Sequence, residues 1–175
     1  MFIFKKNRKS GFTLIELLVV ISIISVLSAI VLASINSART KATTTRETLN
    51  VMQLAKAINL SITDGSYPSS GGTWQCVGIS TGKCWNNFYF PAVTLNNALV
   101  GNISTTPIPG DPEMLSNSFY YAYNANYTSG AAPFGPGAYL MWFVRDIGNT
   151  SCGSAFVFAI SISSGVTYRQ CLMKI

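Results

Sequence analysis

The chain has 175 residues, of which 49% are hydrophobic and only 10% are charged, a composition that fits one modest domain plus one long apolar segment and excludes a disordered polymer. It contains no histidine, which removes the commonest general base and the commonest metal ligand. Four of the twelve basic residues lie before Gly11. Without them the chain has eight basic and six acidic side chains, so the net charge of +6 is weak support for a nucleic-acid partner.

The first element in chain order is a basic cluster, KKNRK at 5–9, followed by an apolar segment at 12–35 with a single charge, Glu16. About 20 apolar residues suffice for a helix to cross a membrane, and the basic cluster predicts that the amino-terminal end stays cytoplasmic. A secretory signal is one alternative, but its apolar core runs only about 7–15 residues and ends at a small-residue cleavage site. A plain single-span anchor is the other, and it leaves a costly carboxylate at Glu16 unexplained.

The string KSGFTLIELLVVISII at 9–24 resembles the class III signal of bacterial type IV pilins and type II secretion pseudopilins. The shared features are a short basic leader, a glycine, a phenylalanine, and then an apolar helix with one glutamate four residues after the phenylalanine. The resemblance implies that prepilin peptidase removes residues 1–11 by cutting between Gly11 and Phe12, and then methylates the new amine of Phe12. It also implies that Glu16 serves in methylation and in subunit assembly.

Each residue type in this signal has a physical reason. A glycine before the cut leaves the scissile peptide uncrowded. Glu16 faces the positive end of the helix dipole, and a carboxylate in an apolar bundle needs a cationic partner. The α-amine of Phe12 on a neighbouring subunit is the candidate that the resemblance also implies.

Small residues recur every fourth position along one face of the apolar segment. Such a stripe lets helices approach closely in lipid or in a packed bundle. We expect it to seat one subunit's helix against the next, with chance as the alternative. Its members are Ser25, Ala29, Ala33 and Ser37.

The helical pattern continues through 36–63. The residues Val51, Ala55, Ile58 and Ile62 recur at steps of three and four, which predicts an amphipathic face that packs on a sheet. An Asp-Gly pair at 64–65 ends this helix, and Pro68 forbids its resumption.

Residues 64–116 are rich in Gly, Ser, Thr, Asn and Pro and predict an irregular connection at the start of an exported head, 64–175. The four cysteines lack C-x-x-C spacing, so in an exported domain they predict two disulfides, with free thiols as the alternative. Short separation favours Cys76 with Cys84 and Cys152 with Cys171. Asp111 and Glu113 are close enough to share calcium, but no calcium-loop motif surrounds them, so we expect no cofactor.

Four strands are predicted at 119–124, 138–145, 155–162 and 166–171. Short connections favour an antiparallel meander over 117–175. The aromatic residues at 120–127 and 142–143 could stack on bases or sugars, but we expect them to pack within the sheet. The predicted fold class is α+β: a long helix, membrane-spanning in its first half, whose second half packs on a small antiparallel sheet.

The sequence therefore predicts a structural subunit of a type IV pilus or pilus-like filament. No nucleophile elbow, phosphate loop or metal cluster appears, so we expect no enzyme activity. Expected partners are prepilin peptidase, identical or related pilin subunits, an inner-membrane assembly platform, and membrane lipid before assembly. The alternatives are a type II secretion pseudopilin and a minor DNA-binding competence pilin. The expected location is a single-pass cytoplasmic membrane protein, amino terminus in and head out, that becomes an extracellular or periplasmic filament.

Overall fold

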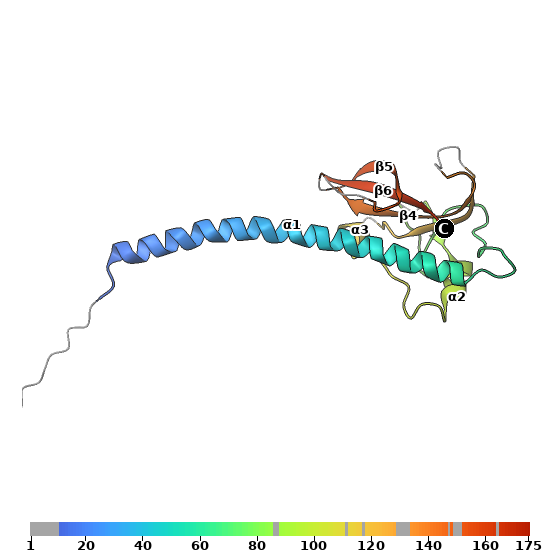
Figure 1. Cartoon of the computed structure of the whole chain (residues 1–175), viewed down its shortest axis with the longest axis horizontal. Coiled ribbons are helices and arrows are strands. Elements are labelled where there is room, and N and C mark those ends of the chain that lie inside the picture. The colour runs from blue at the N-terminus through green and yellow to red at the C-terminus, as the bar shows by residue number, and fades with distance from the viewer. Residues whose placement is uncertain are drawn as a thin grey trace, which may run out of the picture. The chain divides into compact units, whose positions relative to one another are not determined.

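The computed structural model describes residues 11–85, 88–110, 112–116, 118–128, 134–146, 148, 152–163 and 165–175, without the side chains of residues 112 and 113. It divides into two compact units, residues 1–39 and 40–175. Figure 1 shows the elements of each unit.

Helix α1 covers Leu14–Leu60 and runs through both units. It begins one residue after Thr13, whose side chain accepts the Glu16 N–H at the first turn. It ends where Ser61 N–H donates to the Ile58 carbonyl, and a left-handed turn at Asp64 and Gly65 then reverses the chain. The helix thus stops three residues before the predicted end at residue 63.

The first unit is an apolar helix whose large hydrophobic side chains are exposed from Phe12 to Ile35. The most apolar 18-residue window of α1 has a mean hydropathy of 2.8 and contributes nothing to the interior of the chain. Among the described residues, α1 is the one helix long and apolar enough to cross a membrane.

The second unit contains a six-stranded sheet with the order β2-β1-β3-β4-β6-β5. All its pairings are antiparallel except that of β1 with β2. The strands are β1 Gln75–Cys76, β2 Phe90–Pro91, β3 Ala122–Tyr127, β4 Gly137–Arg145, β5 Phe156–Ser163 and β6 Val166–Lys174. The predicted α+β class is confirmed.

The predicted meander is wrong, because β6 lies between β4 and β5. The tight β5–β6 turn keeps those two strands adjacent. Near both ends of the longer β4–β5 connection, residues are bonded to β6. Asp146 N–H donates to the Thr167 carbonyl at 2.8 Å, and Cys152 is bonded to Cys171. As the outermost strand on this side of the sheet, β5 leaves several residues exposed, among them Ile160 and Ile162.

The connection at 64–116 is more ordered than predicted. Besides β1 and β2 it carries helix α2, Val93–Leu99, and helix α3, Pro112–Ser116. Leu95 and Leu99 of α2 are buried in the main core.

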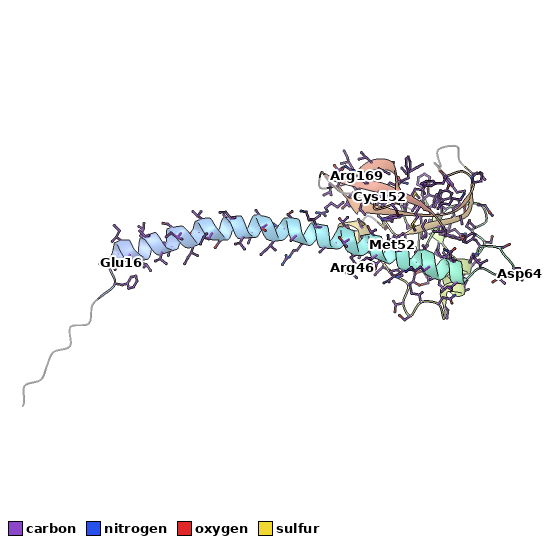
Figure 2. All side chains as sticks on the ribbon, in the orientation of Figure 1. Glu16, Arg46, Met52, Asp64, Cys152 and Arg169 are labelled. Carbon is purple, nitrogen blue, oxygen red and sulfur yellow. A yellow bond between two sulfur atoms is a disulfide. The ribbon has the colours of Figure 1, made fainter. Side chains whose placement is uncertain are left out.

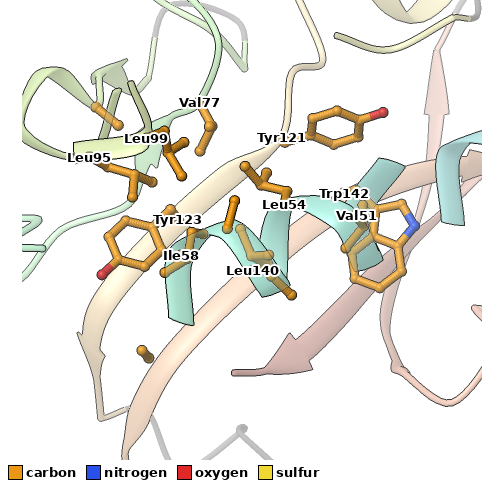
Figure 3. Close-up of a cluster of buried hydrophobic side chains, with 14 of the residues drawn as sticks. Val51, Leu54, Ile58, Val77, Leu95, Leu99, Tyr121, Tyr123, Leu140 and Trp142 are labelled. Atoms are coloured by element: carbon orange, nitrogen blue, oxygen red, sulfur yellow. The ribbon is translucent and has the colours of Figure 1, made fainter. Parts of the chain in front are cut away.

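The main core lies between α1 and one face of the sheet (Figure 3). Val51, Leu54 and Ile58 of α1 pack there with inward side chains of β3 and β4, among them Tyr123 and Trp142. The prediction was wrong for Ile62, which lies beyond the end of α1 and is 37% exposed.

Candidate functional site

The sequence-predicted cleavage site lies immediately before α1. Gly11 has no neighbouring atom within 4 Å of the position a Cβ would take, and Phe12 is 78% exposed. An uncrowded peptide outside regular secondary structure is open to a peptidase. The basic leader at 1–10 lies outside the described residues.

Glu16 sits in the first turn of α1 and closes a capping box with Thr13 (Figure 2). The Thr13 N–H and hydroxyl each donate to Glu16 Oε2 at 2.8 Å, and Glu16 N–H donates to Thr13 Oγ1 at 3.3 Å. The box satisfies orphan donors at the helix start and gives the carboxylate polar partners within its own chain. In sequence, Glu16 lies four residues after Phe12, which the predicted cut would make the new amino terminus.

The predicted packing stripe lies on the exposed surface of the first unit. Ser25 Oγ donates to the Ile21 carbonyl at 2.7 Å, and Ser22 Oγ beside the stripe donates to the Leu18 carbonyl at the same distance. Both hydroxyls are satisfied within the helix, so at these two positions an apolar partner would leave no hydroxyl without a hydrogen bond. The role of Ser25, Ala29, Ala33 and Ser37 in packing remains a prediction.

The structure adds a buried carboxylate that the sequence interpretation missed. Glu47 is fully buried in the second unit, accepts the Gly110 N–H at 2.6 Å and accepts the Tyr121 hydroxyl. Asn50 Nδ2 donates to the same Tyr121 oxygen at 3.1 Å. Burial, then the nearby Glu47 carboxylate, raises the pKa of Tyr121 well above its ordinary value, so the phenol stays a donor.

One signal in the sequence points to this position. Glu47 precedes Val51 by four residues and Leu54 by seven, so helical spacing puts it on the buried stripe of α1. The residues leading to it, TKATTTRE at 40–47, are mostly polar, so the buried stripe was not recognised as beginning at Glu47.

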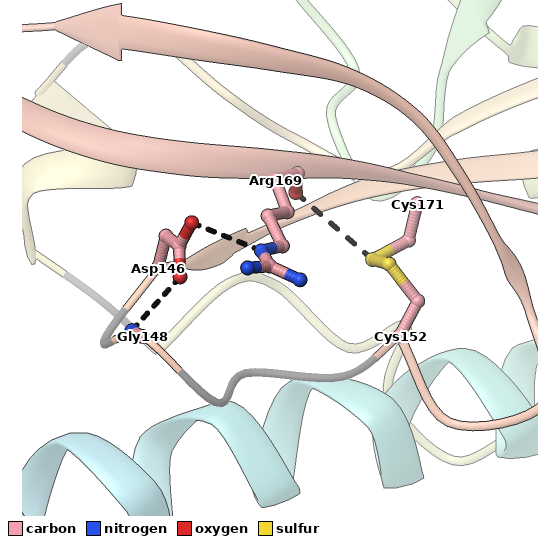
Figure 4. Close-up of polar contacts among 5 residues, drawn as sticks. All are labelled: Asp146, Gly148, Cys152, Arg169 and Cys171. Carbon is pink, nitrogen blue, oxygen red and sulfur yellow. Dashed lines mark hydrogen bonds and ion pairs between the residues drawn. A yellow bond between two sulfur atoms is a disulfide. The ribbon is translucent and has the colours of Figure 1, made fainter.

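The structure pairs Cys76 with Cys84 and Cys152 with Cys171, the pairs that short separation favours. Figure 4 shows the second disulfide beside an ion pair between Asp146 and Arg169. The carboxylate lies 2.9 Å from Arg169 Nε and accepts the Gly148 N–H at 3.0 Å. The hydrogen bond with Arg169 is the main cause that lowers the pKa of Asp146.

The remaining sequence-predicted groups form no second site in the described part of the chain. Asp111 and the side chain of Glu113 lie outside the described residues, and no group of three or more metal-ligating side chains occurs within them. Tyr121, Tyr123 and Trp142 are core residues, as sheet packing predicts. Two head cations have local partners, because Lys83 lies over the Phe90 ring and Lys174 donates to the Phe134 carbonyl.

Residues 6–32 match the family model of the prokaryotic N-terminal methylation motif. It spans the predicted cut, Glu16 and most of the apolar segment, and supports the recognition made from residues 9–24. The motif is structural and has no known enzymatic role. No curated protein and no solved structure matches the chain significantly.

Proposed function

Because the chain carries the N-terminal methylation motif of type IV pilin-like and pseudopilin proteins, we propose that it is a structural subunit of a type IV pilus or pilus-like filament. The observation that carries this proposal is the position of the motif. It covers the proposed, uncrowded cleavage site and most of the exposed apolar segment 12–35, whose one charged residue is Glu16.

The proposed sequence of events follows from the groups at that end. Prepilin peptidase cuts after Gly11 and methylates Phe12, which leaves an α-amine four residues from Glu16. While the subunit waits in the membrane, the two Thr13 donors satisfy the carboxylate. During assembly the carboxylate pairs with the amine of a neighbouring subunit, since a charge entering an apolar bundle needs an opposite charge.

The proposed topology places the leader in the cytoplasm, the apolar segment 12–35 across the inner membrane and the disulfide-bonded second unit outside. The positive-inside bias supports the orientation, and two disulfides fit an oxidising compartment. A type II secretion pseudopilin shares every one of these features. The genes beside this one, for a pilus or for a secretion system, would distinguish the two.

Mass spectrometry of the mature chain, purified from cells that possess the peptidase, tests the processing step. We expect an amino terminus at methylated Phe12. An intact Met1 in such cells would contradict the proposal.

Assembly is tested by comparing Glu16→Ala and Glu16→Gln with Ser22→Ala. Glutamine keeps an acceptor for Thr13 but removes the charge, so if the charge matters both Glu16 variants insert in the membrane and give few filaments. Ser22→Ala loses only a hydroxyl bonded within the helix and serves as the matched control. A normal filament yield from Glu16→Gln would contradict the proposed pairing of charges during assembly.

A further inference from the structure

The face of the sheet turned away from α1 carries a pocket of about 440 Å³. Leu140, Trp142 and Val144 of β4 point into the core against α1, so by strand alternation Phe143 points to the opposite face. Three aromatic side chains and three polar ones supply most of the lining: Trp85, Phe119, Phe143, Ser161, Ser163 and Gln170.

The strand register explains how this pocket forms. Phe143 pairs with Gln170 of β6, and Ser161 of β5 pairs with Tyr168 of β6. The Trp85 and Phe119 rings cover Phe143 at centroid distances of 4.6 and 4.4 Å. Phe119 and Phe143 are buried in this stack, so the half-buried Trp85 is the most exposed ring of the aromatic wall, beside a floor of serines and glutamine from β5 and β6.

Trp85 is held in this wall at a conformational cost. Its φ is +56°, a left-handed conformation that a bulky side chain rarely adopts, and Ser118 has φ +57°. The two residues are tied together, because Trp85 N–H donates to the Ser118 carbonyl at 2.8 Å. The indole Nε1 also donates to the Tyr120 carbonyl at 2.9 Å. Such strained conformations persist only where the surrounding contacts hold them, and they cluster at functional sites.

Gln170 supplies an accessible polar group in the floor. Its side chain is only 9% exposed, and its amide nitrogen faces the Met141 sulfur, a weak acceptor. Its amide oxygen has no hydrogen-bond partner among the described residues and is not one of their fully buried atoms, so it is open to solvent or to a ligand. A ligand hydroxyl would satisfy it.

We propose that this pocket binds a neutral pyranose sugar. A pyranose has an apolar C–H face that fits the aromatic wall and hydroxyls that fit the serines and Gln170. The described lining carries no charged side chain, which disfavours an ionic ligand, and the volume lies within the range of small-molecule sites, roughly 300–1,000 Å³. This role would be additional to filament building.

The test uses the full mature chain in a zwitterionic detergent that has no sugar headgroup. Methyl glycosides of glucose, galactose, mannose and N-acetylglucosamine are titrated, with tryptophan fluorescence and saturation-transfer NMR as readouts. We expect at least one to bind saturably, with Kd on the order of 1 mM for a single sugar ring. Trp85→Ala and Gln170→Leu should each weaken binding about tenfold or more.

Two further variants keep the test decisive. Ser161→Leu fills the floor from an outer strand without touching the aromatic wall, so it should fold and abolish binding. Trp74→Ala is the matched control, because that ring packs on Tyr127 and does not line the pocket. Near-ultraviolet circular dichroism and intact disulfides verify each fold.

Three results would overturn the proposal. They are no binding by any of the four sugars at about 50 mM, equal binding by Ser161→Leu and the wild type, and tighter binding of an anionic sugar such as methyl glucuronide. Filament yield is measured in parallel, and it bears on the proposed function alone.

Discussion

Glu47 shows how one carboxylate organises the second unit. From α1 it accepts the Gly110 N–H at the end of a proline-rich loop and the Tyr121 hydroxyl just before β3. Helix, loop and sheet therefore meet at a single buried side chain. Removing one partner from such a network costs more than the bond itself contributes, because the other groups stay buried without partners.

Replacing Glu47 with leucine should reduce the free energy of unfolding by about 3 kcal/mol, since Gly110 N–H and the Tyr121 hydroxyl each lose an acceptor. Glu47→Gln keeps one acceptor oxygen and should lose roughly half as much. Urea unfolding of the mature chain in detergent, followed by tryptophan fluorescence, measures both. Lys41→Gln, at an exposed position of α1, is the control, and a leucine variant as stable as that control would contradict this role.

Asp146 should make stability depend on pH. Its pKa is lowered in the folded state, chiefly by the hydrogen bond with Arg169, so its contribution is full above the unfolded-state pKa and is lost as pH falls through the folded-state value. We expect Asp146→Asn to lower Tm at neutral pH, with a gap that narrows as pH decreases toward 2. The same substitution in an Arg169→Gln background should add little. A gap independent of pH would show that the ion pair is not the cause.

At the scale of elements, the local sequence pattern predicted whether a segment forms a strand better than it predicted which strands lie side by side in the sheet. The strand at 137–145 was predicted almost residue for residue because its apolar run is bounded by glycine and by Asp146. The position of β6 between β4 and β5 was not predicted, since it depends on long-range backbone contacts, such as that of Asp146 N–H with the Thr167 carbonyl, that strand periodicity does not encode. Helix α2 was missed because seven residues give too short a window for helical spacing.

In the candidate sites too, residues close together in the sequence were easier to predict than groups brought together by the fold. Gly11, Phe12 and Glu16 could be predicted from the sequence because their spacing along one segment carries the signal, and the matched methylation motif covers them. The pocket beside Trp85 was not found, because its walls come from distant segments that meet only through the strand register.

The small-residue stripe on α1 should matter for assembly rather than insertion. Replacing Ala29 and Ala33 with leucine adds bulk where a neighbouring helix would approach, but keeps the segment apolar. We expect normal membrane levels and a filament yield reduced several-fold, measured by shearing filaments from cells and immunoblotting. Val31→Leu, which adds volume on the opposite face, should assemble normally. Equal yields from both variants would show that the spacing arose by chance.

At the scale of the whole molecule, the two units have separate physical requirements. The first unit is apolar and exposed, so lipid or other subunits must cover it. The second unit has its own core, sheet and disulfides, all within residues 40–175. Nothing in that core draws on Gly11, Phe12 or Glu16, so processing and head folding should be separable.

Blocking the cut tests this separation. Gly11→Leu places a branched side chain at the proposed scissile bond, so the leader should stay attached and no Phe12 amine should form. We expect the uncut chain in the membrane fraction with both disulfides formed, seen as unchanged thiol labelling after denaturation, but no filaments. Ser10→Leu, one residue earlier, is the control for added bulk. Filaments built from uncut Gly11→Leu subunits would show that the amine is dispensable, whereas loss of the disulfides would show that head folding depends on processing.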